Sequence, residues 1–227
     1  MKREYTKKER FANWLYYHKW SLAACAVVIW VAGSMLWNIL GIGQVKPDYR
    51  VAYVGSRRIP ENSVAVLENA LAAFGEDLNG DGQVAVALTQ HITADPTSTD
   101  NMMYGYAADM TVLADITEGQ STFFLLEDPV EFQLSFQILS HLDGSAPAED
   151  DFEALDKVYR WADCPALAAL ELGTYEDKYL DLTETGSVQD LLANLYVGRR
   201  YFYIAEQDVH PEANARFWQA LTEGASP

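Results

Sequence analysis

The sequence predicts an α/β domain attached to a single N-terminal transmembrane helix. The first observation is an uncharged, mostly apolar run over residues 21–42, which is long enough to cross a bilayer. The second is an alternation of apolar strands and amphipathic helices from residue 50 onward. We therefore divide the chain into a basic cytoplasmic tail (1–20), a transmembrane helix (21–42), a linker (43–49) and an extracytoplasmic domain (50–227).

The segment 21–42 has the length and composition of a membrane-spanning helix. At about 1.5 Å per residue it spans roughly 33 Å, and a backbone in lipid must satisfy its own hydrogen bonds. Residues 1–19 hold six Lys and Arg against two Glu, which predicts a cytoplasmic N-terminus by the positive-inside bias. The near interface carries an aromatic belt, formed by Trp14, Tyr16, Tyr17 and Trp20.

Two other interpretations of this segment remain open. A cleavable signal peptide has a shorter apolar core, whereas this run is long and ends in bulky residues such as Leu36 and Trp37. Residues 22–25 spell a lipobox, but they stand at the start of the apolar run instead of its end. We favour an uncleaved signal-anchor that contacts lipid through residues 21–42.

The charge of the remaining chain limits its partners. After residue 19 there are ten Lys and Arg against 31 Asp and Glu, so this part is strongly acidic within a total net charge of −17. An acidic domain repels polyphosphate, which excludes nucleic acid as a partner and favours cations or basic partners. The only two cysteines are Cys25, inside the apolar run, and Cys164, in the extracytoplasmic domain, so we expect no disulfide between them. An extracytoplasmic domain with one free thiol is more typical of a Gram-positive surface than of a disulfide-rich secreted protein.

Strands that are apolar throughout, alternating with amphipathic helices, predict a mostly parallel sheet covered on both faces, as in a Rossmann-like three-layer domain. Asp128-Pro129 with Glu131 predicts a capped helix start. The pattern of the second half is less regular, with a polar stretch over 173–186. The predicted elements are strands at 50–55, 84–88, 121–127 and 200–205, and helices at 61–74, 104–118, 129–141, 152–164, 187–197 and 211–223.

Residues 77–82 match the calcium-loop pattern D-x-N-x-D-G. In such a loop the first, third and fifth side chains and the seventh carbonyl converge on the ion. The twelfth position, which should supply a bidentate glutamate, is Leu88. The alternative is a tight polar turn in which glycines supply positive φ angles. The candidate Ca²⁺ ligands are Asp77, Asn79, Asp81 and Gln83, and no other cofactor is predicted.

Open parallel sheets bind ligands beyond the carboxyl ends of their strands. An arginine there could hold a carboxylate, and the acids a polar ligand. The alternative is that Asp128 only caps its helix and the others are solvated loop residues. The candidate ligand-binding residues are Ser56, Arg57, Gln90, His91, Glu127 and Asp128.

No pattern in the sequence predicts an enzyme. The nucleophile elbow, the Walker loop and the dinucleotide fingerprint are missing, and the four histidines have no metal-ligand spacing. Cys164 has no base beside it in the sequence and is interpreted as a buried, inert thiol. Arg199 and Arg200 could attract a phosphate or a partner, but charges that keep an edge strand soluble are the ordinary explanation.

The leader FANWLYYHKW at 11–20, running into one apolar helix, resembles that of uncharacterised single-pass, signal-anchor membrane proteins of Gram-positive, clostridia-like bacteria. Residues 48–142 are distantly similar to a lobe of extracellular solute-binding proteins. The resemblance implies a location and a fold, and it transfers no functional residue.

The leading hypothesis is a non-enzymatic binding protein, anchored in the cell membrane, whose extracytoplasmic domain binds a small polar ligand or a neighbouring membrane protein. The alternative is a scaffold or assembly subunit of a membrane complex without a ligand of its own. An extracellular hydrolase is a third hypothesis.

Overall fold

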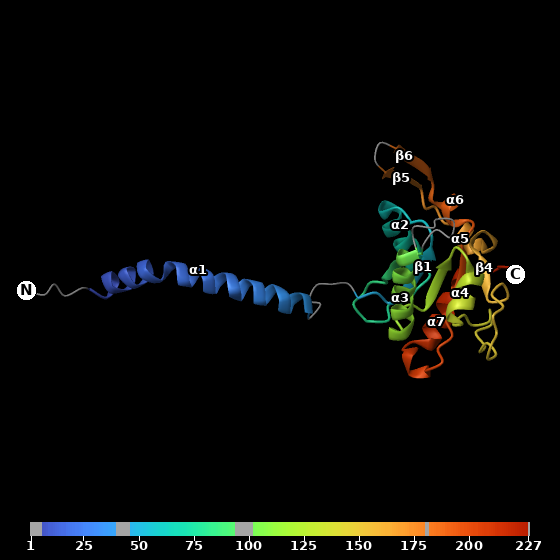
Figure 1. Cartoon of the computed structure of the whole chain (residues 1–227), viewed down its shortest axis with the longest axis horizontal. Coiled ribbons are helices and arrows are strands. Elements are labelled where there is room, and N and C mark those ends of the chain that lie inside the picture. Colours follow the sequence, from blue (N-terminus) through green and yellow to red (C-terminus); the bar gives the residue numbers. More distant parts are fainter. Residues whose placement is uncertain (1–5, 40–45, 94–101, 180–181, 227) are drawn as a thin grey trace, which may run out of the picture. The chain divides into compact units, whose positions relative to one another are not determined.

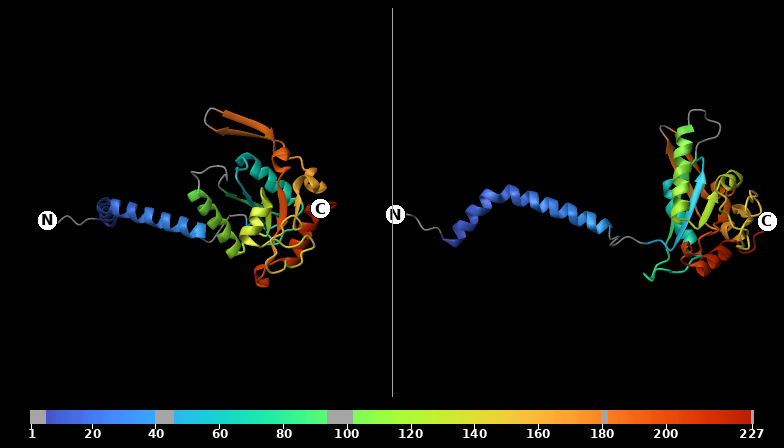
Figure 2. Two further views of the ribbon diagram at one scale, coloured as in Figure 1. Left: turned by 45° about the vertical axis from the view of Figure 1, so that its right-hand side comes forward. Right: turned by 60° about the horizontal axis from the view of Figure 1, so that its bottom comes forward.

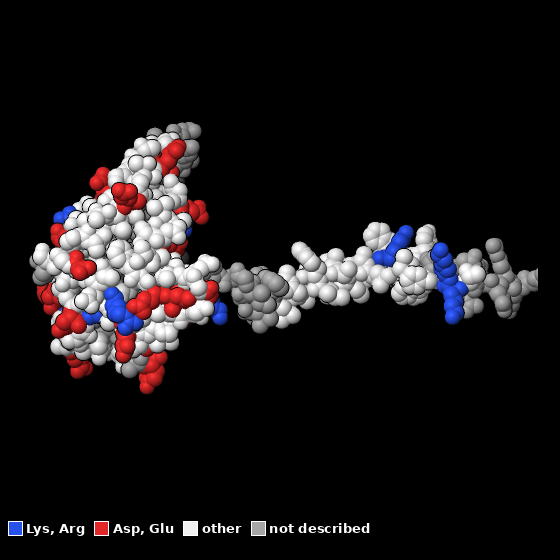
Figure 3. Space-filling model, turned by 180° about the vertical axis from the view of Figure 1, so that it is seen from behind, with Lys and Arg blue, Asp and Glu red and all other residues white. Residues whose placement is uncertain are grey.

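The computed structural model describes residues 6–39, 46–93, 102–179 and 182–226. The chain forms two compact units, residues 1–45 and residues 46–227 (Figure 1). Acidic side chains are spread over the face of the second unit that Figure 3 shows, in line with its composition.

The first unit is built on one helix, α1 (Lys7–Ile39). Its segment Asn13–Leu36 has a mean hydropathy of 1.6 and is the only helix in the described residues whose length and composition suit a membrane crossing. A helix of this kind near the N-terminus is found in membrane anchors and in signal sequences alike. The helix starts well before the predicted boundary at residue 21, and residues 40–42 of the predicted span lie outside the described part.

The second unit is an α/β domain with a mixed sheet of five strands in the order β2-β1-β3-β7-β4. The central strand pairs β1–β2 and β1–β3 are parallel, whereas β3–β7 and β4–β7 are antiparallel. The strands are β1 (Tyr49–Gly55), β2 (Val86–Ile92), β3 (Phe123–Leu126), β4 (Val158–Arg160) and β7 (Tyr196–Arg199), and a separate antiparallel hairpin joins β5 (Thr174–Tyr179) to β6 (Leu182–Ser187).

Helices cover both faces of the sheet (Figure 1, Figure 2). Four helices contribute to the core on one face: α2 (Glu61–Ala72), α5 (Pro165–Ala168), α6 (Val188–Leu192) and α7 (Pro211–Leu221). The other face packs against α3 (Met102–Glu118) and α4 (Pro129–Phe136). Two single turns of 3₁₀ helix, η2 (Trp161–Asp163) and η3 (Ala205–Gln207), complete the described elements.

Alternate residues of the central strands supply the two cores. On the α7 face, the rings of Tyr49 and Phe217 stack with centroids 4.2 Å apart, and Phe123 packs against Phe217 at 4.9 Å. On the α4 face, Phe124 meets Phe132 at 5.0 Å. Strands buried on both sides explain the continuous apolar runs, because neither face of the sheet meets water.

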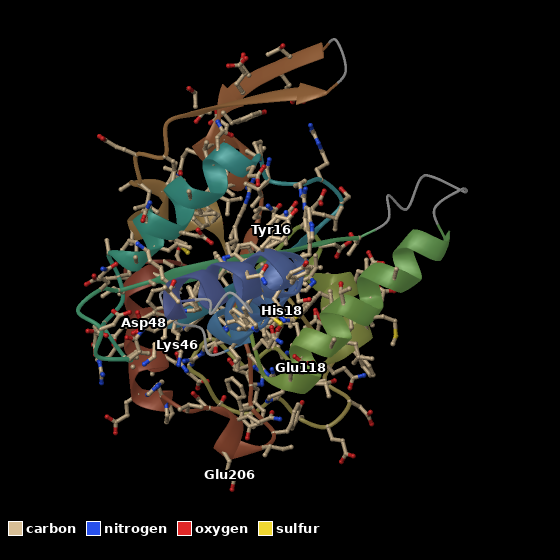
Figure 4. The ribbon with its side chains drawn as sticks, turned by 90° about the vertical axis from the view of Figure 1, so that its left-hand side faces the viewer. Tyr16, His18, Lys46, Asp48, Glu118 and Glu206 are labelled. Atoms are coloured by element: carbon tan, nitrogen blue, oxygen red, sulfur yellow. The ribbon has the colours of Figure 1, made fainter. Side chains whose placement is uncertain are left out.

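The sheet is mixed, so the prediction of a mostly parallel sheet is only partly right. Apolar runs predict that a strand is buried but leave its direction open, since parallel and antiparallel buried strands have the same composition. The strand predicted at 200–205 lies instead at 196–199, and the helix predicted to precede it ends at Leu192. Glu206 belongs to η3, is exposed, and points away from the domain (Figure 4).

One further prediction for the second half is wrong, and a stretch without a predicted element forms strands. The helix predicted at 152–164 is replaced by the short strand β4 and the turn η2, and the unpatterned stretch at 173–186 forms the β5–β6 hairpin. Pairing of β4 with β7 is a long-range interaction that local periodicity does not report. The hairpin projects from the rest of the domain (Figure 1).

Candidate functional site

The carboxyl ends of β1 and β3 lie side by side and bring two predicted site residues together. The Ser56 hydroxyl donates to the Glu127 carboxylate at 2.9 Å, and the Ser56 backbone N–H donates to the same group. A side chain at Gly55 would place its Cβ within 3 Å of Tyr53 Oη and of Glu127 Oε2, so these two side chains would have to shift to admit it. The parallel pairing of β1 and β3, with Val54 opposite Leu126, brings the residues that follow the two strands to this junction.

Arg57, the next residue, reaches the hairpin. Its Nη2 lies 3.0 Å from Glu184 Oε2 on β6, with both side chains largely exposed. Tyr53 Oη donates to the Arg57 carbonyl at 2.6 Å, and burial, assisted by the negative charge of Glu127, raises the pKa of Tyr53 to about 12. The phenol stays protonated at neutral pH and acts as a donor that shapes the loop after β1.

Gln90 and His91 lie within β2 and are engaged by other elements. The Gln90 carboxamide accepts from Ile59 N–H at 2.8 Å and donates to the Ile59 carbonyl at 3.2 Å, so it fixes the loop before α2. His91 is buried on the α3 face, with its ring nitrogens 3.2 Å from Thr111 Oγ1 and from Asp115 Oδ2.

Asp115 is the centre of a buried polar network. Besides His91, its carboxylate accepts from the Ser121 backbone N–H at 2.9 Å and from the Ser121 hydroxyl at 2.8 Å. Burial acts to raise the pKa of Asp115, but the hydrogen bonds from His91 and Ser121 outweigh it and hold the pKa below its ordinary value. The network ties β2 and the start of β3 to α3.

Asp128 caps α4, as its sequence context predicts. Its Oδ1 accepts from the N–H groups of Val130 and Glu131 at 3.0 and 2.9 Å, and Pro129 occupies the first turn. The helix ends at Phe136, earlier than predicted, because Gln137 adopts a left-handed conformation with φ of 51°. The carboxylate is thus used in helix capping.

The loop at 77–82 is a series of Asx turns anchored by Asp48. The two Asp77 oxygens accept from Gly80 and Gly82 N–H at 2.7 and 2.8 Å, and Asn79 and Asp81 each accept from the N–H two residues later. Asp48, the residue before β1, accepts from Leu78, Asn79 and Ala85 N–H; Figure 4 labels its side chain. A distant carboxylate therefore reaches the loop, where it binds backbone donors. Gln83 follows as an exposed residue, and Ca²⁺ binding stays a prediction.

A cavity of about 480 Å³ lies at the other end of the central strands, where β3 begins and β7 ends. Its apolar wall includes Phe123 and Phe202, and the first turns of α7 contribute Pro211 and Ala215. Its charged residues are Asp143, Asp208, Arg199 and Arg200. A cavity of this size suits a small molecule, and both its polar and its apolar surfaces could contact one.

The two arginines of the cavity were interpreted from sequence as surface charges, and the structure places them differently. Arg199 Nε donates to Ser140 Oγ at 3.1 Å, and its guanidinium lies over the Trp218 ring with a separation of 5.4 Å. Arg200 is only 9% exposed. Burial lowers the pKa of both residues from the ordinary value. An arginine pair inside an aromatic segment was the one available sequence signal.

A second charged cluster surrounds Lys157, whose side chain is fully buried. Its ammonium lies 3.0 Å from Asp151 Oδ2 and 2.9 Å from Asp156 Oδ1, and it donates to the Glu153 carbonyl at 2.6 Å. His141 lies 3.7 Å from Asp151 and 3.6 Å from Asp156. His141, Asp151 and Asp156 each offer a ligand atom, and these atoms lie close enough together to hold a metal ion. The ammonium of Lys157 already offsets one of the two carboxylate charges.

Cys164 is fully buried, as predicted, and burial raises the pKa of its thiol to about 11. The thiol is therefore protonated at neutral pH and a poor nucleophile.

Comparison of the chain with protein-family models, with curated proteins and with solved structures finds no match.

Proposed function

We propose that this protein is a membrane-anchored, extracytoplasmic binding protein whose α/β domain takes a small ligand in the cavity between β3, β7 and α7. The observation that carries the proposal is the cavity itself: about 480 Å³, lined by Phe123 and Phe202 and by Arg199 and Arg200, of which Arg200 is buried. In this proposal α1 is an uncleaved anchor in the cell membrane, and the basic residues before it stay in the cytoplasm.

The strand-end cluster supports the binding function less well than the cavity does. Its charged groups already have partners within the domain: Glu127 accepts a hydrogen bond from Ser56, and Arg57 forms an ion pair with Glu184. We infer that these residues organise the loops above the sheet. The distant likeness to a solute-binding lobe is part of the same proposal and adds no residue to it.

Ligand binding is tested by thermal unfolding of the full chain in detergent micelles, against a panel of amino acids, short peptides, sugars, organic acids and divalent ions. A ligand at a hundred times its Kd stabilises the folded state by about 2.7 kcal/mol, which raises the Tm by about 5–10 °C in a domain of this size. The matched control is Ala215→Trp, because Ala215 lines the cavity yet is exposed. No shift with any compound, or equal shifts in the variant, would count against binding in the cavity.

The membrane arrangement has a separate test. Protease added to intact cells that express the chain should digest the domain and leave the N-terminal tail protected. A domain that resists protease until the cells are lysed, or a chain released without detergent, contradicts the proposed location.

A scaffold subunit is the second candidate, favoured by exposed apolar side chains on two helices. Met110 and Leu113 on α3 are 62% and 45% exposed, and Val130 and Leu134 on α4 are 44% and 54% exposed. Large contiguous apolar patches, unlike single exposed apolar residues, mark protein-binding surfaces, and these four side chains belong to the two helices that cover the same sheet face. A partner that copurifies in detergent with the parent chain and is lost from Leu134→Glu would favour this function.

A further inference from the structure

Arg199 is the arginine of the cavity that keeps a donor open to solvent. Its Nε donates to Ser140 Oγ at 3.1 Å, its Nη2 donates to the Leu142 carbonyl at 3.4 Å, and its guanidinium lies over the Trp218 ring of α7. Nη1 donates to no residue in the described part of the chain, and it is not among the buried atoms there that lack a partner. Because Arg199 lines the cavity, Nη1 is a donor that a ligand in the cavity can reach.

The negative charges of the cavity lining are those of Asp143 and Asp208. Burial lowers the pKa of Arg199, and the charges of the two aspartates act against that shift, so both lie near the guanidinium. Among the described residues neither aspartate forms an ion pair with Arg199. Asp143 Oδ1 accepts from Ser145 N–H at 2.8 Å, whereas Asp208 Oδ1 accepts from Asn214 Nδ2 at 2.7 Å and its Oδ2 has no hydrogen bond to a described residue. The cavity therefore holds a cation and an anion that do not neutralise each other by direct contact.

The lining of the cavity limits which ligand fits. Arg200 adds no second cationic contact, because it is buried and donates to the Ile116 carbonyl of α3. A purely anionic ligand would lie beside the aspartates and a purely cationic one beside Arg199, so each would meet a like charge. Phe123 and Phe202 give the cavity an apolar wall. A ligand with one positive charge, one negative charge and an apolar body matches all of these features.

We propose that the cavity binds zwitterionic amino acids with an apolar side chain, in which Arg199 receives the carboxylate and Asp208 receives the ammonium. Hydrogen bonds between ionised partners are shorter and stronger than neutral ones, and a guanidinium matches the geometry of a carboxylate. This inference rests on the proposed function, since it names the ligand class of the same cavity.

The test uses three probes that share a phenyl ring. L-Phenylalanine carries both charges, phenethylamine lacks the carboxylate, and hydrocinnamate lacks the ammonium. Each probe is titrated calorimetrically into the full chain in detergent micelles, with a blank titration into empty micelles. Phenylalanine should bind the parent chain at least about 10-fold more tightly than either of the other probes does, because only phenylalanine engages both charged groups.

Two variants remove one charge each, and each has a matched control. Arg199→Gln is compared with Arg216→Gln, which removes an exposed arginine that pairs with Glu76 and lies outside the cavity lining. Asp208→Asn is compared with Glu206→Gln, which removes an exposed carboxylate of η3 that also lies outside the lining. Circular dichroism confirms the folding of each variant.

Both controls should bind phenylalanine as the parent does, and both cavity variants at least about 10-fold more weakly. The other probes separate the two roles: Asp208→Asn should weaken the binding of phenethylamine and not that of hydrocinnamate, and Arg199→Gln should do the reverse. Asp208→Asn keeps the test valid if Arg199→Gln unfolds, because asparagine retains an oxygen that accepts from Asn214.

Three outcomes overturn the inference. Equal affinity of the parent for phenylalanine and for one of the other probes refutes recognition of a zwitterion, while a cavity ligand stands. Unchanged phenylalanine affinity in a folded Asp208→Asn or Arg199→Gln refutes the assigned roles. Failure of all three probes at millimolar concentration refutes the inference too, and the proposed function then survives only if the wider panel yields a ligand that Ala215→Trp excludes.

Discussion

Replacing Asp115 by alanine should strongly destabilise the domain. Asp115 is 4% exposed and accepts three hydrogen bonds, at 2.9 and 2.8 Å from Ser121 and at 3.2 Å from His91. Alanine leaves the Ser121 N–H and the His91 ring nitrogen buried without an acceptor, and each such group costs about 1–3 kcal/mol. The hydroxyl can rotate toward another acceptor, so we expect a loss of about 3 kcal/mol in the free energy of unfolding.

The assay is thermal unfolding of the full chain in detergent micelles, followed by near-ultraviolet circular dichroism. A loss of about 3 kcal/mol lowers the Tm by about 6–12 °C for a domain of this size. Asp115→Asn keeps an acceptor for the Ser121 N–H and should lose about half as much. The matched control is Asp109→Ala, an exposed position on the same helix, which should change stability by less than about 0.5 kcal/mol.

The same residue predicts a pH dependence. Because the pKa of Asp115 is lower in the folded than in the unfolded state, the unfolded chain binds the proton first as the solution is acidified. The carboxylate therefore contributes stability above an unfolded pKa of about 3.9, and that contribution is lost as the pH falls through the folded value. Asp115→Asn should lack this component. Equal destabilisation by Asp115→Ala and Asp109→Ala, or identical acid profiles for parent and Asp115→Asn, refutes the network as a source of stability.

Three further predictions follow from single contacts. Lys157→Met should lower the free energy of unfolding by about 2 kcal/mol, because it leaves the carboxylates of Asp151 and Asp156 without their cation. Both carboxylates are partly exposed to solvent, which reduces the loss. A Tm within 1 °C of the parent contradicts this prediction. Gly144→Ala should lower the free energy of unfolding by about 1–2 kcal/mol more than Gly80→Ala does. Both glycines have positive φ, but only a Cβ at position 144 would meet the Arg199 guanidinium. Equal losses of stability in the two variants contradict the steric explanation. The predicted calcium loop should show a chelator-reversible rise in the Tm with millimolar Ca²⁺ that Asp77→Asn abolishes; an unchanged Tm identifies residues 77–82 as a plain polar turn, in which the Asp77 oxygens bind backbone N–H groups alone.

Features that depend on a few neighbouring residues could be predicted from sequence. The cap of α4 follows from Asp128-Pro129, because capping uses the next two or three N–H groups. The buried strand β3 follows from its run of four large apolar residues. The meeting of Ser56 with Glu127 was also foreseeable in outline, because parallel strands end at the same edge of a sheet.

The cavity arginines and the roles of Gln90 and His91 were not predictable in this way. Gln90 and His91 were taken as strand ends because β2 was placed too early, at 84–88 instead of 86–92. Because of this error in the bounds of β2, the pairing of His91 with Asp115, which are 24 residues apart, was not foreseen. Arg200 became a buried cation only because α3 and η3 close over it.

By itself the sequence determined the apolar N-terminal helix, the acidic α/β domain and the first three strand–helix pairs, because hydrophobic periodicity and capping are local properties of the chain. Only the tertiary structure decided that β7 runs antiparallel beside β3, that residues 173–186 leave the sheet as a hairpin, and that Arg199 and Arg200 line a cavity. These features depend on contacts between segments that are far apart in the sequence. Whether a side chain is buried is decided by those distant segments and not by its neighbours in the sequence.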